Sequence, residues 1–277
     1  TASGRTLLGA DDKAGIAEIM AALSAFHRSV ELPHPELRIV FTPDEEIGQG
    51  TVGIDTERLA PVGYTVDGGD MGVIEEECFT AHEARVLFTG RNVHPGYAKD
   101  RMINAGAAAA RFAATLPEHD TPEHTEGREG FSHLTGLEGC ENEASLTYIL
   151  RDFDEENNRR RIALLEGLAG LFRQRFPGLG VRVEVREQYR NMKEALARHP
   201  EVVARAEQAV EAAGLRPVKR PIRGGTDGAR LSFMGMPCPN LFSGAMLPHS
   251  RTEWVSETVM QKAAETIVRL CGLWAGR

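Results

Sequence analysis

Apolar residues that recur every three or four positions predict amphipathic helices in this chain. From Asp11 onward, such a stripe is formed by Ile16, Ile19, Met20, Leu23 and Phe26. Further helices are predicted over residues 104–116 (rich in alanine), 157–176, 200–213 and 256–273.

Short runs of alternating or β-branched apolar residues predict strands between these helices. Residues 37–41 read Leu-Arg-Ile-Val-Phe and end at an acidic segment, and Tyr64–Val66 ends at Asp67-Gly68-Gly69. Polar residues at strand ends favour an open α/β sheet, because ligands of such sheets bind beyond the carboxyl ends of the strands. Other strands are predicted over residues 86–89, 146–150 and 181–185.

The middle of the chain has a different order of elements. Strand, helix, strand, helix and strand follow one another there, which is typical of a compact α+β unit, and residues 117–130 are predicted to be an exposed loop within it. We therefore predict an α/β domain with a mixed sheet flanked by helices, formed by residues 1–78 and 189–277. An α+β domain over residues 79–188 is inserted into it.

Composition excludes some classes of protein. The net charge of −8, from 40 acidic and 32 basic side chains, argues against nucleic acid as a partner, since phosphates attract basic surfaces. No apolar run approaches the roughly 20 residues that span a bilayer, so we expect no membrane association. The four cysteines are scattered without a Cys-x-x-Cys pair, so we expect reduced thiols in a cytoplasmic protein.

Four segments contain residues that could perform chemistry. Each has an ordinary alternative: Asp11 or Asp12 could be a helix N-cap, and an acidic run or a lone histidine is often only a solvated surface. Together, several carboxylates and an imidazole suit Zn²⁺, Co²⁺ or Mn²⁺, and one of two adjacent glutamates can bind metal while the other acts as a general base. The segments are Gly9–Gly15, Thr42–Glu46, Asp67–Gly69 and Pro248–Glu253.

These segments resemble the peptidase T family, in the superfamily of dinuclear zinc exopeptidases. The resemblance runs in order along the whole chain. It rests on Thr6–Gly15, Phe41–Glu46, Tyr64–Gly69, Asn92–Gly96, Arg151–Asp154 and Ile222–Gly228. It implies an incomplete exopeptidase catalytic domain, whose N-terminal part is lacking, with the inserted domain as a lid and dimerisation domain.

For the metal site, the resemblance implies two divalent ions, most simply Zn²⁺, with Co²⁺ or Mn²⁺ as alternatives. Asp11 would bridge the ions and precede a cis peptide bond to Asp12. Glu46 and His249 would bind one ion and Asp67 the other, with Glu45 as the general base. The family's remaining ligand is a histidine upstream of the Gly-Ala-Asp-Asp segment, and none of the ten residues before Asp11 is a histidine.

For the substrate, the resemblance implies that His94 reaches the active site of a second copy in a homodimer and stabilises the tetrahedral intermediate. Arg151 and Arg223 would hold the C-terminal carboxylate of the peptide, although each could instead form a structural ion pair. The implied activity is removal of the N-terminal residue from tripeptides. A related dipeptidase, an N-acyl amino acid hydrolase and a non-catalytic dimerising module remain alternatives.

Overall fold

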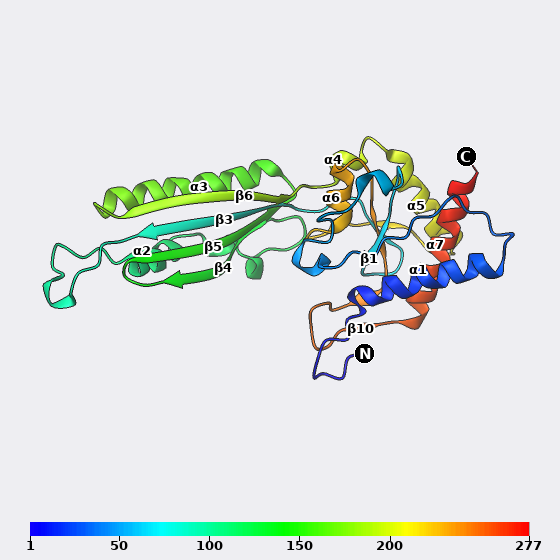
Figure 1. The fold of residues 1–277 in the computed structure, drawn as a ribbon, viewed down its shortest axis with the longest axis horizontal. Helices are drawn as coiled ribbons and strands as arrows, with labels where there is room; N and C mark the ends of the chain where they lie inside the picture. Colours follow the sequence, from blue (N-terminus) through cyan, green and yellow to red (C-terminus); the bar gives the residue numbers. More distant parts are fainter. Residues whose placement is uncertain (277) are drawn as a thin grey trace. The chain divides into compact units, whose positions relative to one another are not determined.

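The computed structural model describes residues 1–276, which form two compact units (Figure 1). Unit 1 consists of Thr1–Cys78, Asn191–Ile222 and the chain from Thr226 onward. Unit 2 consists of Phe79–Arg190 and the short segment Arg223–Gly225. The chain therefore passes from one unit to the other four times, and each unit has its own hydrophobic core.

Unit 1 is built around a mixed sheet with the strand order β1-β8-β2-β7. β8 runs parallel to β1 and antiparallel to β2, and β7 runs parallel to β2. A separate antiparallel pair is formed by β9 and β10. The strands are β1 (Thr65–Gly68), β2 (Val73–Glu75), β7 (Val218–Lys219), β8 (Asn240–Phe242), β9 (Ala245–Met246) and β10 (Trp254–Val255).

Helices flank this sheet. Ile74, Leu241 and Phe242 of the sheet pack against apolar residues of α5 and α7, and α1 lies against α7 and β1. A smaller cluster joins Cys78 and Leu196 to Ala229. The helices of unit 1 are α1 (Ala10–Arg28), α4 (Lys193–Leu196), α5 (Pro200–Ala212), α6 (Asp227–Phe233) and α7 (Glu257–Ala275).

The predicted helix after Asp11 is confirmed, and its predicted stripe is buried only in part. Phe26 of the stripe is buried and Ile19 and Leu23 are half-buried, whereas Ile16 is 42% and Met20 50% exposed. Ala14, Glu18 and Ala22, which lie outside the stripe, are buried. α1 packs mainly against α7, and small side chains let two helices approach closely. The side chains that meet the neighbouring helix, rather than the largest ones, therefore define the buried face.

The predicted strand over residues 37–41 is wrong. The segment is irregular, and Ile39, Val40 and Phe41 are 38%, 48% and 52% exposed. A strand needs a hydrogen-bonded neighbour, and within residues 1–276 no strand pairs with this segment. The alternation of residue types along this segment does not show whether a neighbouring strand is present.

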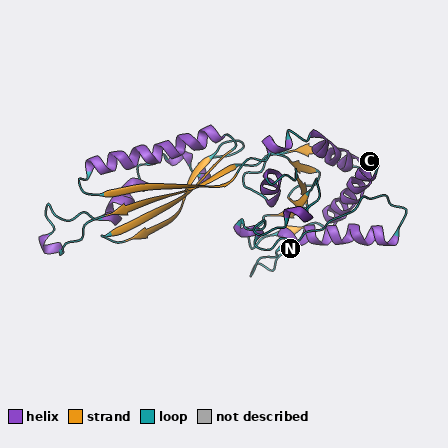
Figure 2. Cartoon of the chain, turned by 45° about the horizontal axis from the view of Figure 1, so that its top comes forward, coloured by secondary structure: helices purple, strands orange, loops and turns teal. Residues whose placement is uncertain are grey.

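Unit 2 is a four-stranded antiparallel sheet with two helices on one face (Figure 2). The helices meet each other over the sheet, where the rings of Phe112 and Phe172 lie edge to face at 5.1 Å. The strand order is β4-β5-β3-β6. The elements are β3 (Thr80–Thr89), α2 (Ala105–Ala113), β4 (Phe131–Gly139), β5 (Glu143–Asp152), α3 (Glu155–Arg175) and β6 (Gly180–Tyr189).

β4 is the strand of unit 2 that the sequence pattern did not predict. Its residues are half-buried or exposed and include Gly136, so apolar and polar positions do not alternate clearly. Residues 117–130 are not simply an exposed loop either, because they contain two 3₁₀ turns and the half-buried Asp120.

None of the helices among residues 1–276 combines the length and the apolar character that a membrane-spanning helix needs.

Candidate metal centre

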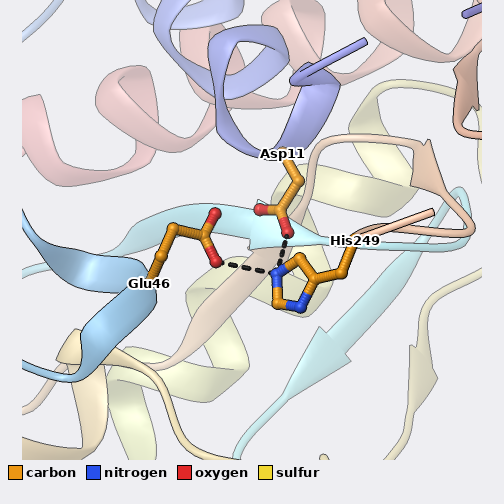
Figure 3. Close-up of side chains that lie close together, drawn as sticks. All are labelled: Asp11, Glu46 and His249. Carbon is orange, nitrogen blue, oxygen red and sulfur yellow. Dashed lines mark hydrogen bonds and ion pairs between the residues drawn. The ribbon is translucent and has the colours of Figure 1, made fainter. Parts of the chain in front are cut away.

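Three side chains from distant parts of unit 1 converge at one point (Figure 3). Asp11 lies at the start of α1, Glu46 lies in a 3₁₀ turn (Glu45–Ile47), and His249 lies in the loop between β9 and β10. The Nε2 atom of His249 is 2.7 Å from Oε2 of Glu46 and 3.2 Å from Oδ2 of Asp11. One ligand atom from each residue lies within 4.8 Å of the others, which is the arrangement a single metal ion requires.

Irregular backbone places these side chains. Asp44, just before the 3₁₀ turn, has a φ of 60°, and His249 has a φ of 58°, values that non-glycine residues rarely adopt. The Asp11–Asp12 peptide bond is cis, as the resemblance implied, and both residues have non-helical backbone angles. The orientation of Asp11 is therefore not dictated by the periodicity of α1.

Further carboxyl groups crowd around this point. Asp67, in β1, is hydrogen-bonded to Asp11, and burial together with the charges of Asp12 and Asp11 raises its pKa to about 10. Burial also raises the pKa of Asp12 to about 7, although the N–H of Gly15 donates to its Oδ1 at 3.1 Å. Burial and the charge of Asp227 raise the pKa of Glu45 to about 7.

These raised pKa values indicate how a bound cation would affect the cluster of carboxyl groups. Burial and mutual repulsion disfavour the charged forms of carboxyl groups that face one another, and a bound cation would have the opposite effect on their pKa values. At His249, partial burial would lower the pKa, but the hydrogen bonds and charges of the Glu46 and Asp11 carboxylates raise it. The donor set of carboxylates and one imidazole fits a divalent ion at Asp11, Glu46 and His249, and Asp67 beside Asp11 offers a ligand for a second ion.

The other candidate residues lie in unit 2. His94 is exposed and begins a short 3₁₀ turn (Pro95–Tyr97), where its Nδ1 accepts a hydrogen bond of 3.1 Å from the N–H of Gly96. A neutral ring in this arrangement carries its proton on Nε2. The Nε2–H group of His94 is then a hydrogen-bond donor.

Both arginines donate to groups of their own unit. Arg151 donates to the carbonyls of His82 and Leu150 and to Oε1 of Gln188, at 3.1, 3.0 and 2.7 Å. Burial lowers its pKa, and its guanidinium lies 5.4 Å from the ring centre of Tyr189. The side chain is held in place by its neighbours.

Arg223 is bound to the segment of residues 125–129. Its Nη1 donates to the carbonyls of Gly127 and Glu129 at 3.1 and 2.6 Å, and its Nη2 to the carbonyl and hydroxyl of Thr125 at 3.3 and 3.1 Å. Its guanidinium also lies over the ring of Phe79. A substrate carboxylate held by Arg223 would have to replace some of these acceptors.

Two acidic residues lie beside the site although the sequence pattern assigned no role to them. Glu253 is 1% exposed, and its carboxylate accepts hydrogen bonds from the backbone of Gly9 and Asp11. Asp227 is buried beside Glu45, and within residues 1–276 its Oδ2 has no hydrogen-bond partner. The only available signal was their place in the motifs Pro248–Glu253 and Ile222–Gly228, since neither contact is local in sequence.

The mixed sheet flanked by helices and the convergent carboxylates are those of a metal-dependent exopeptidase, and the family comparison agrees. The model of peptidase family M20/M25/M40 matches residues 9–272. The chain belongs to this family.

Individual relatives within this family give a more specific comparison than the family model does. Over 274 residues the chain is 46% identical to peptidase T of Parabacteroides distasonis, a match that covers 99% of this chain and 67% of the relative. It resembles the crystal structure of aminopeptidase PepT from Bacillus cereus, with a TM-score of 0.80, 26% identity, and coverage of 98% of this chain and 72% of the other. A tripeptidase from Staphylococcus aureus has the same fold, with a TM-score of 0.85, 22% identity, and coverage of 99% and 74%. The chain spans about two thirds of the length of the peptidase T relative.

Proposed function

We propose that this chain carries the catalytic carboxylates of a metal-dependent aminopeptidase that removes the N-terminal residue from tripeptides. The observation that carries this proposal is the meeting of Asp11, Glu46 and His249, with Asp67 and Glu45 beside them. The similarity to peptidase T and to an aminopeptidase structure supports the same activity.

In this proposal Glu46 and His249 would hold one divalent ion, Asp67 would hold a second, and Asp11 would be a ligand of both. Zn²⁺ is the simplest choice, with Co²⁺ or Mn²⁺ as alternatives. Bound ions would supply Lewis acidity, which polarises a scissile carbonyl and acidifies a nearby water.

Glu45 acts as the general base. A base that accepts a proton and then passes it to the leaving amine works best when its pKa lies near the working pH. The pKa of Glu45, raised by burial and by Asp227 to about 7, meets that condition. The N–H of Asp227 also donates to the Glu45 carboxylate, which orients it.

Residues of unit 2 bind the substrate in this proposal. The Nε2–H that His94 presents suits an oxyanion, and we propose that His94 supplies it to a second copy of the chain in a homodimer formed through unit 2. Arg151 and Arg223 hold the C-terminal carboxylate of the peptide in this proposal. Since the described residues include four free cysteines, we also infer a cytoplasmic location.

The proposal is tested by offering tripeptides, dipeptides and N-acyl amino acids to the purified protein with Zn²⁺, Co²⁺ or Mn²⁺. We expect release of the N-terminal residue from tripeptides. Release of an acyl group without release of any N-terminal residue would contradict it, because the protein would then be an acyl amino acid hydrolase.

The role of Glu45 is tested by Glu45→Gln, which keeps the size of the side chain but removes the base. We expect kcat to fall about 10²- to 10⁴-fold while bound metal is retained. Asp44→Asn is the matched control, because Asp44 is exposed in the same loop and asparagine tolerates its positive φ. Equal losses in the two variants would show that the loop, rather than the base, had been damaged.

A further inference from the structure

Glu253 is a buried carboxylate between two exposed residues. Its side chain is 1% exposed, whereas Thr252 and Trp254 on either side are exposed. Oε2 accepts from the N–H of Gly9 at 2.6 Å, and Oε1 accepts from the N–H of Asp11 at 3.0 Å. Both carboxylate oxygens of Glu253 are therefore held by backbone amides.

The amides of residues 9–11 need this acceptor. The first N–H groups of a helix have no partner within the helix, and Gly9, at the N-cap of α1, has no side chain to accept from them. Asp11 also has non-helical backbone angles, so the helix does not orient it. The N–H of this ligand donates instead to a side chain more than 240 residues later in the chain.

The same side chain belongs to the loop that presents His249. Glu253 follows His249 by four residues, and its N–H donates to the carbonyl of Ser250 at 3.3 Å, so a tight turn joins the two. The carbonyl of Glu253 accepts from the N–H of Ala2 at 3.0 Å, which ties this loop to the start of the chain as well. Both the backbone and the side chain of Glu253 are engaged within unit 1.

We infer that Glu253 is a positioning residue that holds the metal ligand Asp11 in register with the metal ligand His249. The inference rests on the proposed metal site and extends it to a residue that touches no ion. Groups that orient metal ligands typically change metal affinity 10- to 100-fold when they are replaced. Glutamine in place of Glu253 keeps the shape but directs an NH₂ group at an N–H donor, so one of the two contacts is lost.

The experiment measures Zn²⁺ affinity of the 277-residue chain by competition with a chromophoric chelator, for the wild type, Glu253→Gln and Glu253→Asp. We expect Glu253→Gln to bind Zn²⁺ about 10- to 100-fold more weakly while its far-UV circular dichroism is unchanged. The visible absorption of bound Co²⁺, which reports ligand geometry, should shift in the same variant. Glu257→Gln removes the same charge from an exposed position nearby and should change neither the affinity nor the spectrum.

The outcomes separate this inference from the proposed function. A wild-type chain that binds no Zn²⁺ or Co²⁺ contradicts the metal site itself, and the inference fails with it. A wild type that binds metal, with equal affinity and an equal Co²⁺ spectrum in Glu253→Gln, overturns the inference alone. If Glu253→Gln does not fold, Glu253→Asp decides by the same two measurements. Loss of the folded state in both variants also overturns it, because Glu253 would then hold the fold and not the ligands.

Discussion

Carboxylates cluster in both units, but their surroundings differ. In unit 2, Asp120 and Asp152 converge on Arg161, which donates to Asp120 at 2.7, 2.9 and 3.1 Å and to Asp152 at 2.7 Å. In unit 1, Asp11, Asp12, Asp67 and Glu45 face one another, and burial together with their mutual repulsion raises three of their pKa values. Among the described residues, no lysine or arginine forms an ion pair with these four carboxylates as Arg161 does in unit 2, and the imidazole of His249 lies 3.2 Å from Asp11.

This difference separates a structural ion network from a candidate binding site. Buried acids are tolerated in a fold when a guanidinium satisfies them, as Arg161 does between two carboxylates. Acids that are buried together without such a partner cost free energy, and proteins accumulate them where an external cation binds. The two clusters should therefore respond in opposite ways to mutation and to metal.

The largest effect is expected from Arg161→Ala. It would leave Asp120 and Asp152 without their shared partner, and breaking one side of a buried ion pair typically costs about 3–5 kcal/mol of unfolding free energy. Arg159→Ala is the control, because Arg159 is 68% exposed and its pairs with Glu155 and Glu156 are 3.7 Å long, so its loss should cost less than about 0.5 kcal/mol. Denaturation in urea checks both values, and equal losses would remove the distinction between the clusters.

Removing a ligand from the unit 1 cluster should change metal affinity rather than folding. We expect His249→Ala to weaken Zn²⁺ binding at least about 10-fold, because Asp11 and Glu46 alone lack the nitrogen ligand. His27→Ala, at an exposed position on α1, should bind Zn²⁺ as the wild type does. Isothermal titration of the metal-free chain measures both, and unchanged affinity in His249→Ala would place the ion elsewhere.

A smaller and pH-dependent effect is expected at Glu18 of α1. Burial and then the charge of Asp12 raise its pKa to about 9, and neither carboxylate oxygen has a hydrogen-bond partner among the described residues. Between the unfolded pKa of about 4.3 and the folded pKa, the native state binds the extra proton, so stability falls as pH rises. Glu18→Gln should therefore raise the unfolding free energy at pH 8 by about 1–3 kcal/mol, and by less at pH 5.

The control for Glu18 is the same substitution at the exposed Glu211 of α5, which should leave the pH dependence unchanged. Urea denaturation at the two pH values measures the difference. A gain from Glu18→Gln that is equal at pH 5 and pH 8 would mean that Glu18 does not hold a proton in the fold.

The smallest effect is expected on the outer face of α1. Met20 is 50% exposed, so Met20→Gln should change the unfolding free energy by less than about 0.5 kcal/mol. Denaturation of this variant tests which face of the helix is buried. A loss of unfolding free energy above about 1 kcal/mol would show that Met20 belongs to the buried face, as the spacing of apolar residues predicted.

Local patterns predicted much of the fold because they reflect local physics. Helices α1, α2, α3, α5 and α7 and strand β1 follow from spacing, alanine content and chain breaks, which depend on neighbouring residues alone. The types of side chain at the ends of these elements also indicated divalent metal chemistry. The motif order identified the peptidase family that the comparison shows.

Other features depend on contacts between residues that are distant in the sequence, so local sequence patterns could not predict them. The buried face of α1 is set by α7, residues 37–41 lack a neighbouring strand among the described residues, and β4 is a strand because β5 pairs with it. The hydrogen bonds of Arg223 to residues 125–129 and of Glu253 to the start of α1 span about 100 and 240 residues. The sequence by itself determined which chemical groups are present and which elements hold them. The tertiary structure decided which groups meet, because burial and pairing are properties of the packed chain.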